Sequence, residues 1–509
     1  MRTALGEPWP CARATPNQIN QAIYHHWGRP MDLLLPIERR SPRPLREQLY
    51  DGLRPALLDG RLPAGSRVPP TRGLATQLGV SRFTVEDAFS RLTAEGLLEG
   101  RHGSGTYVTD LGETGAPRPA SAPAIPLPIV PVDRAARRWS TWGTNLDPRA
   151  DRAPAGSHLP FGFHSGMPAL NVFPHALWRR LRTREAREPT LATRDYGPNA
   201  GHPPLRAAIA AYLAGSRGIR CDPARVVITS GTRQSLDLVA RLWLDRGDAV
   251  GMEELGYPAG RRVFQAAGAN VIPIPVDADG LRVDLLNREA ARAKLVYVTP
   301  SHQYPTGGVL SLPRRRALLA WAREAGALVL EDDYDAEFRY GVRPVPALAA
   351  MDAADRRGPT VYLGTFSKVL YPAPRLGYAV LPADMVERFI AAKAVADHHS
   401  PTPDQVALAA FIAEGHFERH LARMRRLYAG RPRALLAALA AEPPGRIHRE
   451  PATEAAGLHL LVGVAGPWSE AELIRRAATG GVHLDPGGAC YAATPPPWPS
   501  LLLGYAVLP

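Results

Sequence analysis

From about residue 160 to the end of the chain, short apolar runs alternate with segments of helical periodicity. The runs "RVVITS", "AKLVYVTP" and "GALVLED" have the length of strands, and intervening segments such as "PRRRALLAWAREAG" are amphipathic. Strands that alternate with helices are typical of an α/β domain with a largely parallel sheet. We therefore predict one large α/β domain over residues 160–509.

The remainder of the 509-residue chain divides by composition, as expected for a length that exceeds one ordinary core. Residues 1–35 have the composition of an irregular N-terminal tail, and residues 36–108 are patterned like a compact small domain. Residues 109–159 are rich in Pro, Ala, Gly and Ser, which predicts a linker partly stiffened by polyproline geometry.

The overall composition, 45% hydrophobic and 21% charged, is that of a globular protein in water. The first thirty residues lack an apolar signal core, and Cys11, Cys221 and Cys490 are too scattered to predict a disulfide framework. A cytoplasmic protein with no membrane partner is therefore expected. The net charge of +13 admits nucleic acid as a partner.

Within residues 36–108, two apolar patterns at helical spacing flank the turn "GVS", with Ser81 as a natural N-cap. The apolar positions are Leu74, Ala75 and Leu78, followed by Val85, Ala88, Phe89 and Leu92. The next segment, "GLLEGRHGSGTYV", is typical of a hairpin with a glycine-rich basic tip. Helix, turn, helix and hairpin in this order predict a winged helix-turn-helix.

The run "PLREQLYDGLRPALLDGRLPAGSRVPPTRGLATQLGVSRFTVEDAFSRLTAEGLLEGRHGSGTYV" resembles the DNA-binding domain of the GntR family. The resemblance implies a homodimer that binds a double-stranded operator. Glu86, on the expected recognition helix, either limits phosphate affinity or reads a cytosine. By the same resemblance, the DNA-contacting residues are Arg72, Ser81, Arg82 and Thr84, with His102 and Gly103 at the tip of the wing.

Lys368 stands out because the chain has only three lysines among its 61 Lys and Arg residues. It follows the strand-like run "TVYLG", and Asp332 and Tyr334 follow another strand, at the sheet edge where open α/β folds bind ligands. The turn in "ITSGTRQSLD" opens a helix and offers an anion site. Together these features favour a Schiff-base lysine for pyridoxal 5′-phosphate (PLP).

The large domain is similar to fold-type I aminotransferases, through "YGPNAGHPPLRAAIAAYL", "TPSHQYPTGG", "EDDYDAEFRY" and "GTFSKVLYPAPRLGY". The resemblance implies that Lys368 forms the aldimine with PLP and that Asp332 pairs with the pyridinium nitrogen. Tyr334 would bond the phenolate oxygen O3′, and Tyr257 would stack on the ring. The phosphate would be held by Gly231, Thr232, Arg233, Thr365, Ser367 and Arg375, and by Tyr196 across a dimer interface. No metal ligands are expected.

A GntR-type winged helix joined by a proline-rich linker to such a domain resembles the MocR subfamily of transcription regulators. The chain departs from active aminotransferases at Tyr304, where they place asparagine, and in "WPSLLLGYAVLP", which lacks their carboxylate-binding arginine. Ala259 also removes a cation that some relatives have. These departures favour a regulator that senses PLP, an amine or an amino acid through an aldimine at Lys368. The alternatives are an active aminotransferase with a DNA-binding appendage, and a DNA-binding module whose large domain is only a dimerisation scaffold.

Overall fold

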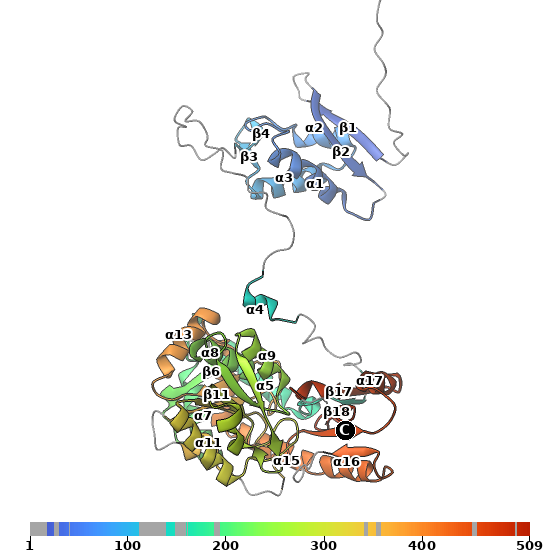
Figure 1. Cartoon of the computed structure of the whole chain (residues 1–509). Helices are drawn as coiled ribbons and strands as arrows, with labels where there is room; N and C mark the ends of the chain where they lie inside the picture. The colour runs from blue at the N-terminus through green and yellow to red at the C-terminus, as the bar shows by residue number, and fades with distance from the viewer. Residues whose placement is uncertain are drawn as a thin grey trace, which may run out of the picture. The chain divides into compact units, whose positions relative to one another are not determined.

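The structure, a computed structural model, describes residues 18–24, 30–39, 41–110, 139–147, 159, 161–187, 194–340, 345–352, 358–449, 456–493 and 496–508. The chain divides into two compact units, Met1–Arg134 and Ala135–Pro509, which are described separately (Figure 1). Most of the predicted linker lies outside the described residues. One short helix, α4 (Thr141–Thr144), lies within its predicted range.

The small unit contains the predicted helix, turn, helix and hairpin. Helix α1 (Leu45–Leu58) precedes α2 (Thr71–Leu78) and α3 (Arg82–Ala94), and strands β3 (Leu98–Arg101) and β4 (Gly105–Val108) pair antiparallel. Gly79 ends α2 with a φ of 62°, in the left-handed region that glycine tolerates. Two residues later Ser81 caps α3, so the chain reverses direction within one tight turn.

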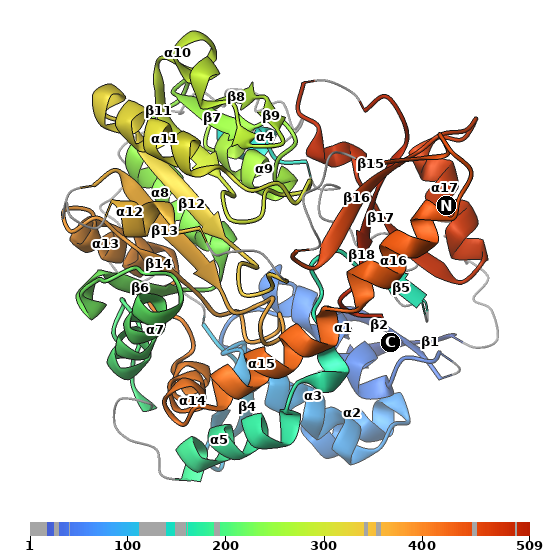
Figure 2. The same ribbon diagram turned by 90° about the horizontal axis from the view of Figure 1, so that it is seen from below.

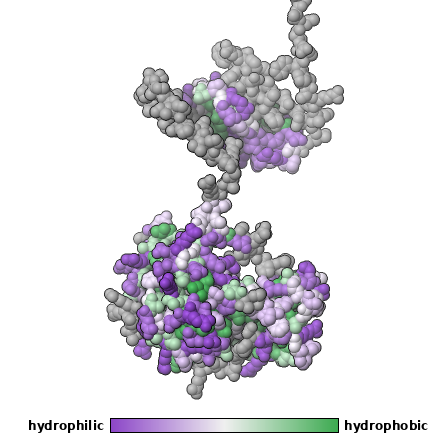
Figure 3. Space-filling view, viewed as in Figure 1, coloured by the Kyte–Doolittle hydropathy of each residue, from purple (hydrophilic) through white to green (hydrophobic). Residues whose placement is uncertain are grey.

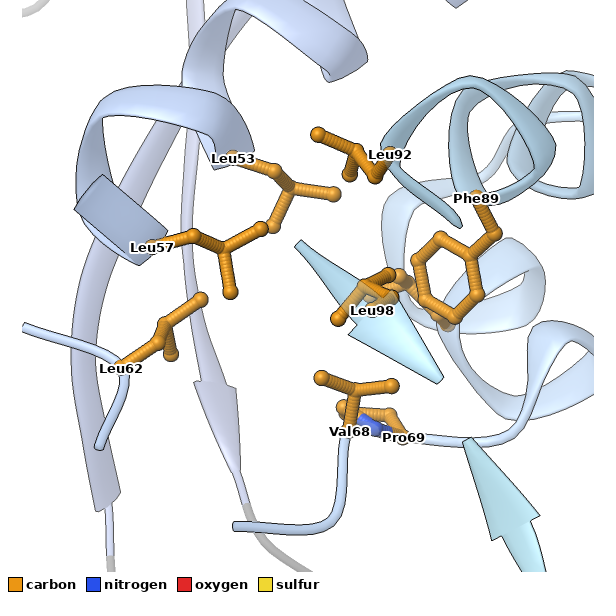
Figure 4. A pocket seen from close by; sticks show the side chains of 9 residues that line it. Leu53, Leu57, Leu62, Val68, Pro69, Phe89, Leu92 and Leu98 are labelled. Carbon is orange, nitrogen blue, oxygen red and sulfur yellow. The ribbon is translucent and has the colours of Figure 1, made fainter. Parts of the chain in front are cut away.

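The helices of the small unit are held together by one apolar core. Figure 4 shows leucines of α1, Phe89 and Leu92 of α3, and Leu98 of β3 pointing toward one another. The cavity among them is only about 10 Å³ and is lined by apolar side chains, so no polar partner for a water is present. This close packing fixes α3 against α1 and leaves the opposite face of α3 exposed.

Two strands lie in the region predicted to be an irregular tail, which corrects that expectation. Strand β1 (Gln18–Tyr24) pairs antiparallel with β2 (Pro30–Glu38). Each strand supplies the other's backbone hydrogen-bond partners. The sequence reading missed this pair because the composition of the tail carries no clear period-2 pattern.

The large unit is built on a seven-stranded sheet, as predicted from the alternating pattern. Its strand order is β6 (Val226–Thr229), β14 (Gly377–Val380), β13 (Thr360–Thr365), β12 (Leu328–Asp333), β11 (Ala293–Val298), β7 (Ala249–Glu253) and β8 (Asn270–Ile274). The register is parallel throughout except at β14, which runs antiparallel to both neighbours. The central strands are buried on both faces, which explains their nearly continuous apolar sequence.

Helices cover both faces of this sheet and enclose three apolar clusters. Helices α8 (Thr232–Trp243) and α9 (Pro258–Ala266) begin directly after strands of the sheet. The other helices are α5 (His175–Arg187), α7 (Pro203–Ser216), α10 (Leu286–Glu289), α11 (Leu312–Ala325), α12 (Leu348–Met351), α13 (Val386–Ala396), α14 (Thr402–Ala413) and α15 (His416–Tyr428). Two short strands, β9 (Val276–Asp277) and β10 (Gly280–Leu281), form a separate hairpin.

A second sheet in the large unit has the order β15 (Ile447–Arg449), β16 (His459–Val464), β18 (Ser500–Gly504), β17 (Val482–Pro486) and β5 (Phe161–Phe163). Helices α16 (Arg431–Ala440) and α17 (Glu470–Thr479) lie beside it in Figure 2. Val462, Leu501 and Leu503 pack against these two helices. Leu461 and Leu502 instead pack with Cys490 and Tyr304. The sheet therefore has one helix-covered face and one face turned toward Tyr304.

Both units present mostly hydrophilic side chains in the view of Figure 3, with apolar residues scattered among them. Among the described residues, no helix has the length and apolar character needed to cross a membrane.

Candidate functional site

Lys368 lies just beyond the end of β13, beside the loop that follows β5. A Cβ atom at Gly166 would lie only 2.6 Å from Lys368 Nζ, so only glycine permits this approach, and its φ is 70°. Burial lowers the pKa of Lys368, although the nearby carboxylates of Asp335 and Asp332 act in the opposite direction. A lowered pKa enlarges the fraction of neutral amine, which is the nucleophilic form.

Asp332 lies at the C-terminal end of β12 and is 4% exposed. Its Oδ2 accepts a hydrogen bond of 2.7 Å from the hydroxyl of Tyr297, whereas its Oδ1 is buried with no hydrogen-bond partner within the described part of the chain. Burial raises the pKa of Asp332 to about 7. A buried oxygen without a partner is costly, so this arrangement suits a ligand that donates a hydrogen bond to Oδ1.

An anion-binding cradle lies at the start of α8. Gly231, with a φ of 124°, precedes Thr232 and Arg233 in the first turn of the helix. A Cβ atom at Gly231 would lie 3.4 Å from Nη2 of Arg375, so the guanidinium stands beside the helix N-terminus. Near by, the hydroxyl of Thr365 accepts a hydrogen bond of 3.2 Å from the backbone N–H of Ser367. Backbone N–H groups and an adjacent forked cation are the partners that a phosphate needs.

The predicted tyrosines occupy three different environments. Tyr257 immediately precedes α9, and its hydroxyl accepts a 3.3 Å hydrogen bond from Nε of Arg233. The hydroxyl of Tyr334 lies 2.8 Å from Nδ1 of His302. Tyr196 is 76% exposed, with its ring beside that of His398. Its predicted contact with a phosphate in a partner subunit therefore stays a prediction.

These residues fit PLP in their chemistry. The amine of Lys368, the unpartnered oxygen of Asp332 and the cradle of Arg375 and Gly231 are the groups that an aldehyde, a protonated ring nitrogen and a phosphate respectively require. These residues are far apart in the sequence. They come together in the fold because β12, β13 and β6, the strand before α8, have their C-terminal ends at the same edge of the sheet.

Several residues of this site were not predicted. Tyr297 on β11 holds Asp332, and the buried rings of His302 and His459 lie 5.5 Å apart between centroids. Asp335 lies 3.0 Å from His302 through its Oδ2. His302 was visible in the motif "TPSHQYPTGG" without a role being assigned to it. Tyr297 and His459 lie within apolar runs that form strands. A single polar side chain in such a run was the only sign in the sequence of a function for either residue.

The loop beside Lys368 is anchored from the second sheet. The backbone N–H of Ser165 donates a 2.6 Å hydrogen bond to Oδ2 of Asp485, and Oδ1 of Asp485 lies 2.9 Å from Nε2 of His483. The ring of His164 stacks on that of His483, with centroids 4.2 Å apart. One nitrogen or oxygen atom from each of these three side chains lies within 4.8 Å of the others. This cluster was not predicted from the sequence. Its evident role is to hold Ser165 and therefore Gly166 in place.

In the small unit, the predicted DNA-contacting residues share the start of α3 and its surroundings. The Ser81 hydroxyl accepts a 3.1 Å hydrogen bond from the backbone N–H of Thr84 and lies 2.8 Å from the Thr84 hydroxyl. Ser81 therefore acts as the predicted N-cap, and the cap occupies part of the hydrogen-bonding capacity of Thr84. Arg72 is exposed on α2.

Two further features of this surface were not predicted. Nε of Arg82 donates a 2.6 Å hydrogen bond to Glu86 one turn later, so these two charges partly neutralise each other. Phe83 is 67% exposed in the first turn of α3. An exposed aromatic side chain at the start of a recognition helix is suited to contact a thymine methyl group.

The tip of the hairpin carries the remaining predicted residues, His102 and Gly103, and both are exposed. Gly103 has a φ of 70°, which explains the glycine at this turn. The guanidinium of Arg67 lies against Gly105, and that of Arg101 lies over the ring of Tyr107. Basic groups therefore line the base of the wing.

Comparison with known proteins identifies both units. Residues 45–108 match the family of bacterial regulatory proteins of the gntR family, and residues 169–499 match aminotransferase class I and II. The chain is 36% identical to the "Probable rhizopine catabolism regulatory protein MocR" of Rhizobium meliloti, over 93% of this chain and 92% of that protein. It is 33% identical to the pyridoxine biosynthesis transcriptional regulator PdxR of Corynebacterium glutamicum, over 78% and 79% of the two chains.

Among solved structures, the chain is similar to LysN, the α-aminoadipate aminotransferase of Thermus thermophilus, complexed with N-(5′-phosphopyridoxyl)-L-leucine. The TM-score is 0.62 at 32% identity, over 69% of this chain and 88% of that one. The large unit thus has the fold-type I aminotransferase architecture, and the small unit has the GntR-family winged helix. The chain therefore belongs to the MocR-type transcription regulators of the GntR family, in which a DNA-binding domain is followed by an aminotransferase-like domain.

Proposed function

We propose that this regulator binds PLP covalently as a Schiff base with Lys368 and that PLP, or a primary amine or amino acid that exchanges with Lys368, controls its binding to an operator as a homodimer. The observation that carries the proposal is that the buried amine of Lys368 lies within electrostatic reach of Asp332, whose Oδ1 has no hydrogen-bond partner among the described residues. An amine, an open carboxylate oxygen and the anion cradle at the start of α8 at one sheet edge are the groups that PLP needs.

When bound, the cofactor supplies an aldehyde carbon that condenses with an amine and releases water. Around it, each residue has a separate task. Asp332, held by Tyr297, would accept a hydrogen bond from the ring nitrogen, and the start of α8 with Arg375 would hold the phosphate. The absence of a side chain at Gly166 lets the Lys368 amine lie against the loop that follows β5.

The sensor reading is favoured over an active aminotransferase by the composition of β18. Transamination needs the substrate carboxylate anchored so that the reacting bond keeps its orientation, and misplacement by about 1 Å can lower a rate ~100-fold. In β18 the side chain that faces Tyr304 is the buried Leu502, whereas Leu501 and Leu503 point to the helix-covered face, so this strand supplies no arginine to the site. Effector binding then changes the equilibrium between two arrangements of the dimer rather than driving turnover.

For DNA, the proposal assigns base and phosphate contacts to Arg72, Ser81, Arg82 and Thr84 and wing contacts to His102 and Gly103. It adds Phe83, whose exposure no packing requirement explains. A major groove admits the exposed first turn of α3, and arginine there can bond two acceptors of guanine.

The test uses one preparation of the full chain. Borohydride reduction in the presence of PLP should fix the cofactor on the peptide that contains Lys368, and operator affinity should change on adding PLP or amines. Label on Lys294 or Lys393, or an operator affinity that ignores cofactor and amines while transamination turns over rapidly, would refute the proposal in favour of an enzyme.

A further inference from the structure

The second sheet turns one face toward the Lys368 site, and on this face the apolar side chains of Leu461 and Leu502 lie between His459 of β16 and Asp485 of β17. Along β16, His459 and Leu461 point to the same side because successive side chains alternate. Leu461 packs with Leu502 of β18 and with Tyr304, whereas Val462 and Leu503 pack on the opposite, helix-covered face. The side that bears His459 is therefore the side of Tyr304.

This face adjoins Lys368 through a chain of close contacts. His459 pairs in register with Gly504, and a Cβ atom at Gly504 would overlap the backbone oxygen of His164. The residues that follow His164 lead to Gly166, which approaches Lys368 Nζ. The His459 ring also lies 5.1 Å from the ring of Tyr304 and 6.4 Å from that of Tyr334.

His459 is the polar group that β16 contributes to this face, whereas Asp485 of β17 is already engaged with the backbone of Ser165 and with His483. The His459 ring is 2% exposed, and its polar neighbour among the described residues is the backbone of Pro305, whose carbonyl oxygen can only accept, so at least one ring nitrogen is left without a partner. Burial lowers the pKa of His459 to about 3, and the hydrogen bond with the Pro305 backbone acts in the opposite direction. The ring is therefore neutral, and with its N–H directed to Pro305 the other nitrogen can accept a hydrogen bond.

The two arginines that act electrostatically on Lys368 are engaged elsewhere. Arg233 donates to Tyr257, and Arg375 stands at the phosphate cradle. The charged groups closest to Lys368 besides these are the carboxylates of Asp332 and Asp335, which repel anions. A carboxylate placed against His459 and Leu502 would thus be buried without a bidentate partner, which is costly.

Resting on the proposed exchange at Lys368, we infer that the effector is a primary amine whose far end is uncharged and carries a hydroxyl group that hydrogen-bonds to His459. A hydroxyl can donate to the remaining nitrogen of the neutral imidazole, whereas an ionised carboxylate has no hydrogen to donate. The hydrocarbon between amine and hydroxyl lies against Leu502 and Tyr304. An amino acid, with its carboxylate, is disfavoured.

The test compares three amines with four carbons each on the PLP-loaded full chain: butylamine, aminobutanol and aminobutanoate. Two readouts are followed in parallel, namely the cofactor absorption spectrum and operator affinity by fluorescence anisotropy. We expect the half-effective concentration of aminobutanol to be about tenfold lower than that of either other amine, the ratio given by one hydrogen bond to a neutral partner. Equal or stronger action of aminobutanoate overturns the inference.

Two variants of His459 complete the design. His459→Phe keeps a ring of similar size but has no nitrogen, so aminobutanol should act at the same concentration as butylamine. His459→Gln keeps a donor and an acceptor and should restore part of the difference. If His459→Phe still responds to aminobutanol at a tenfold lower concentration than to butylamine, His459 is not the group that binds the hydroxyl.

The same experiment separates this inference from the proposed function. If borohydride labels Lys368 and all three amines act equally, the sensor proposal stands and the hydroxyl preference is wrong. If Lys368 is not labelled and no amine changes the spectrum or the operator affinity, both are wrong.

Discussion

The surface around α3 draws its candidate residues from one stretch, residues 72–103, whereas the site around Lys368 draws its own from segments spread between residues 166 and 504. The first group is exposed and formed by local hydrogen bonds such as that from Thr84 to Ser81. The second is buried and contains oxygen and nitrogen atoms that lack partners. The surface around α3 is thus formed mainly by local hydrogen bonds, whereas the Lys368 site leaves Asp332 Oδ1 without a partner among the described residues.

The contrast bears on how the two sites respond to mutation. A residue on the exposed surface can change without affecting the core, so its substitution should alter DNA affinity alone. A residue in the buried site has neighbours from several strands, so its substitution should affect cofactor binding and stability together.

Lys368→Ala should abolish covalent binding of PLP, because no other amine is brought beside Asp332 within the described residues. Mass spectrometry after borohydride reduction should find no label in this variant and one label per chain in the wild type. Lys294→Ala is the matched control, since Lys294 is half exposed and lies 2.7 Å from Asp248. Without PLP, both variants should bind operator DNA as the wild type does; with PLP, the operator affinity should change in Lys294→Ala as in the wild type and stay unchanged in Lys368→Ala.

The same contrast explains what sequence could and could not predict. The helix-turn-helix was readable because its signals, the spacing of Val85 to Leu92 and the cap at Ser81, are local. The parallel sheet and the importance of Lys368 and Asp332 were readable because each follows an apolar run. The roles of Tyr297 and His459 could not be predicted, since they depend on which strands become neighbours. The salt bridge of Arg82 with Glu86 could not be predicted either, because it depends on side-chain rotamers.

Asp332→Asn should change how stability depends on pH in the cofactor-free protein. The pKa of Asp332 is about 7 when folded, above its usual 3.8, so the folded state keeps a proton that the unfolded chain has lost between these values. This group therefore stabilises the fold fully below about pH 4, and that contribution is lost as the pH rises through about 7. Its size is on the order of 4 kcal/mol.

The measurement is urea unfolding of wild type and Asp332→Asn at a series of pH values from about 4 to 8. The difference in unfolding free energy between the two proteins should shrink or reverse as the pH rises, because asparagine does not titrate. Glu331, a buried acid whose pKa is raised by burial and by Asp333, contributes equally to both proteins and cancels, whereas Asp332 is one cause of the raised pKa of Glu253, so the two carboxyls titrate as a coupled pair. A difference independent of pH would show that Asp332 is ionised throughout this range.

Arg82→Ala should weaken operator binding by about 1–3 kcal/mol if the guanidinium reads a base. The loss should fall on one position of the operator, whereas loss of a phosphate contact would weaken all sequences alike and reduce the dependence on salt. Arg61→Ala, an exposed arginine beside Asp59, serves as the control. PLP labelling should be unchanged in both. Reduced PLP labelling in Arg82→Ala would contradict the view that the two sites respond to mutation independently.

Glu86→Gln tests which role Glu86 has, and its effect should be the smallest. The exposed pair of Arg82 and Glu86 contributes about 0.3–0.5 kcal/mol to the helix, so stability should hardly change. If Glu86 only neutralises Arg82, the variant should bind every DNA sequence more tightly, because one negative charge has been removed from the surface and Arg82 is released to the phosphates. If Glu86 instead accepts a hydrogen bond from a cytosine amino group, tighter binding to random DNA should accompany weaker discrimination at one C·G pair of the operator. Anisotropy titrations on the operator, on single-base variants of it and on random duplex separate the two outcomes. We expect the first, since the carboxylate already accepts a 2.6 Å hydrogen bond from Nε of Arg82, and reading a base would require it to give up that partner.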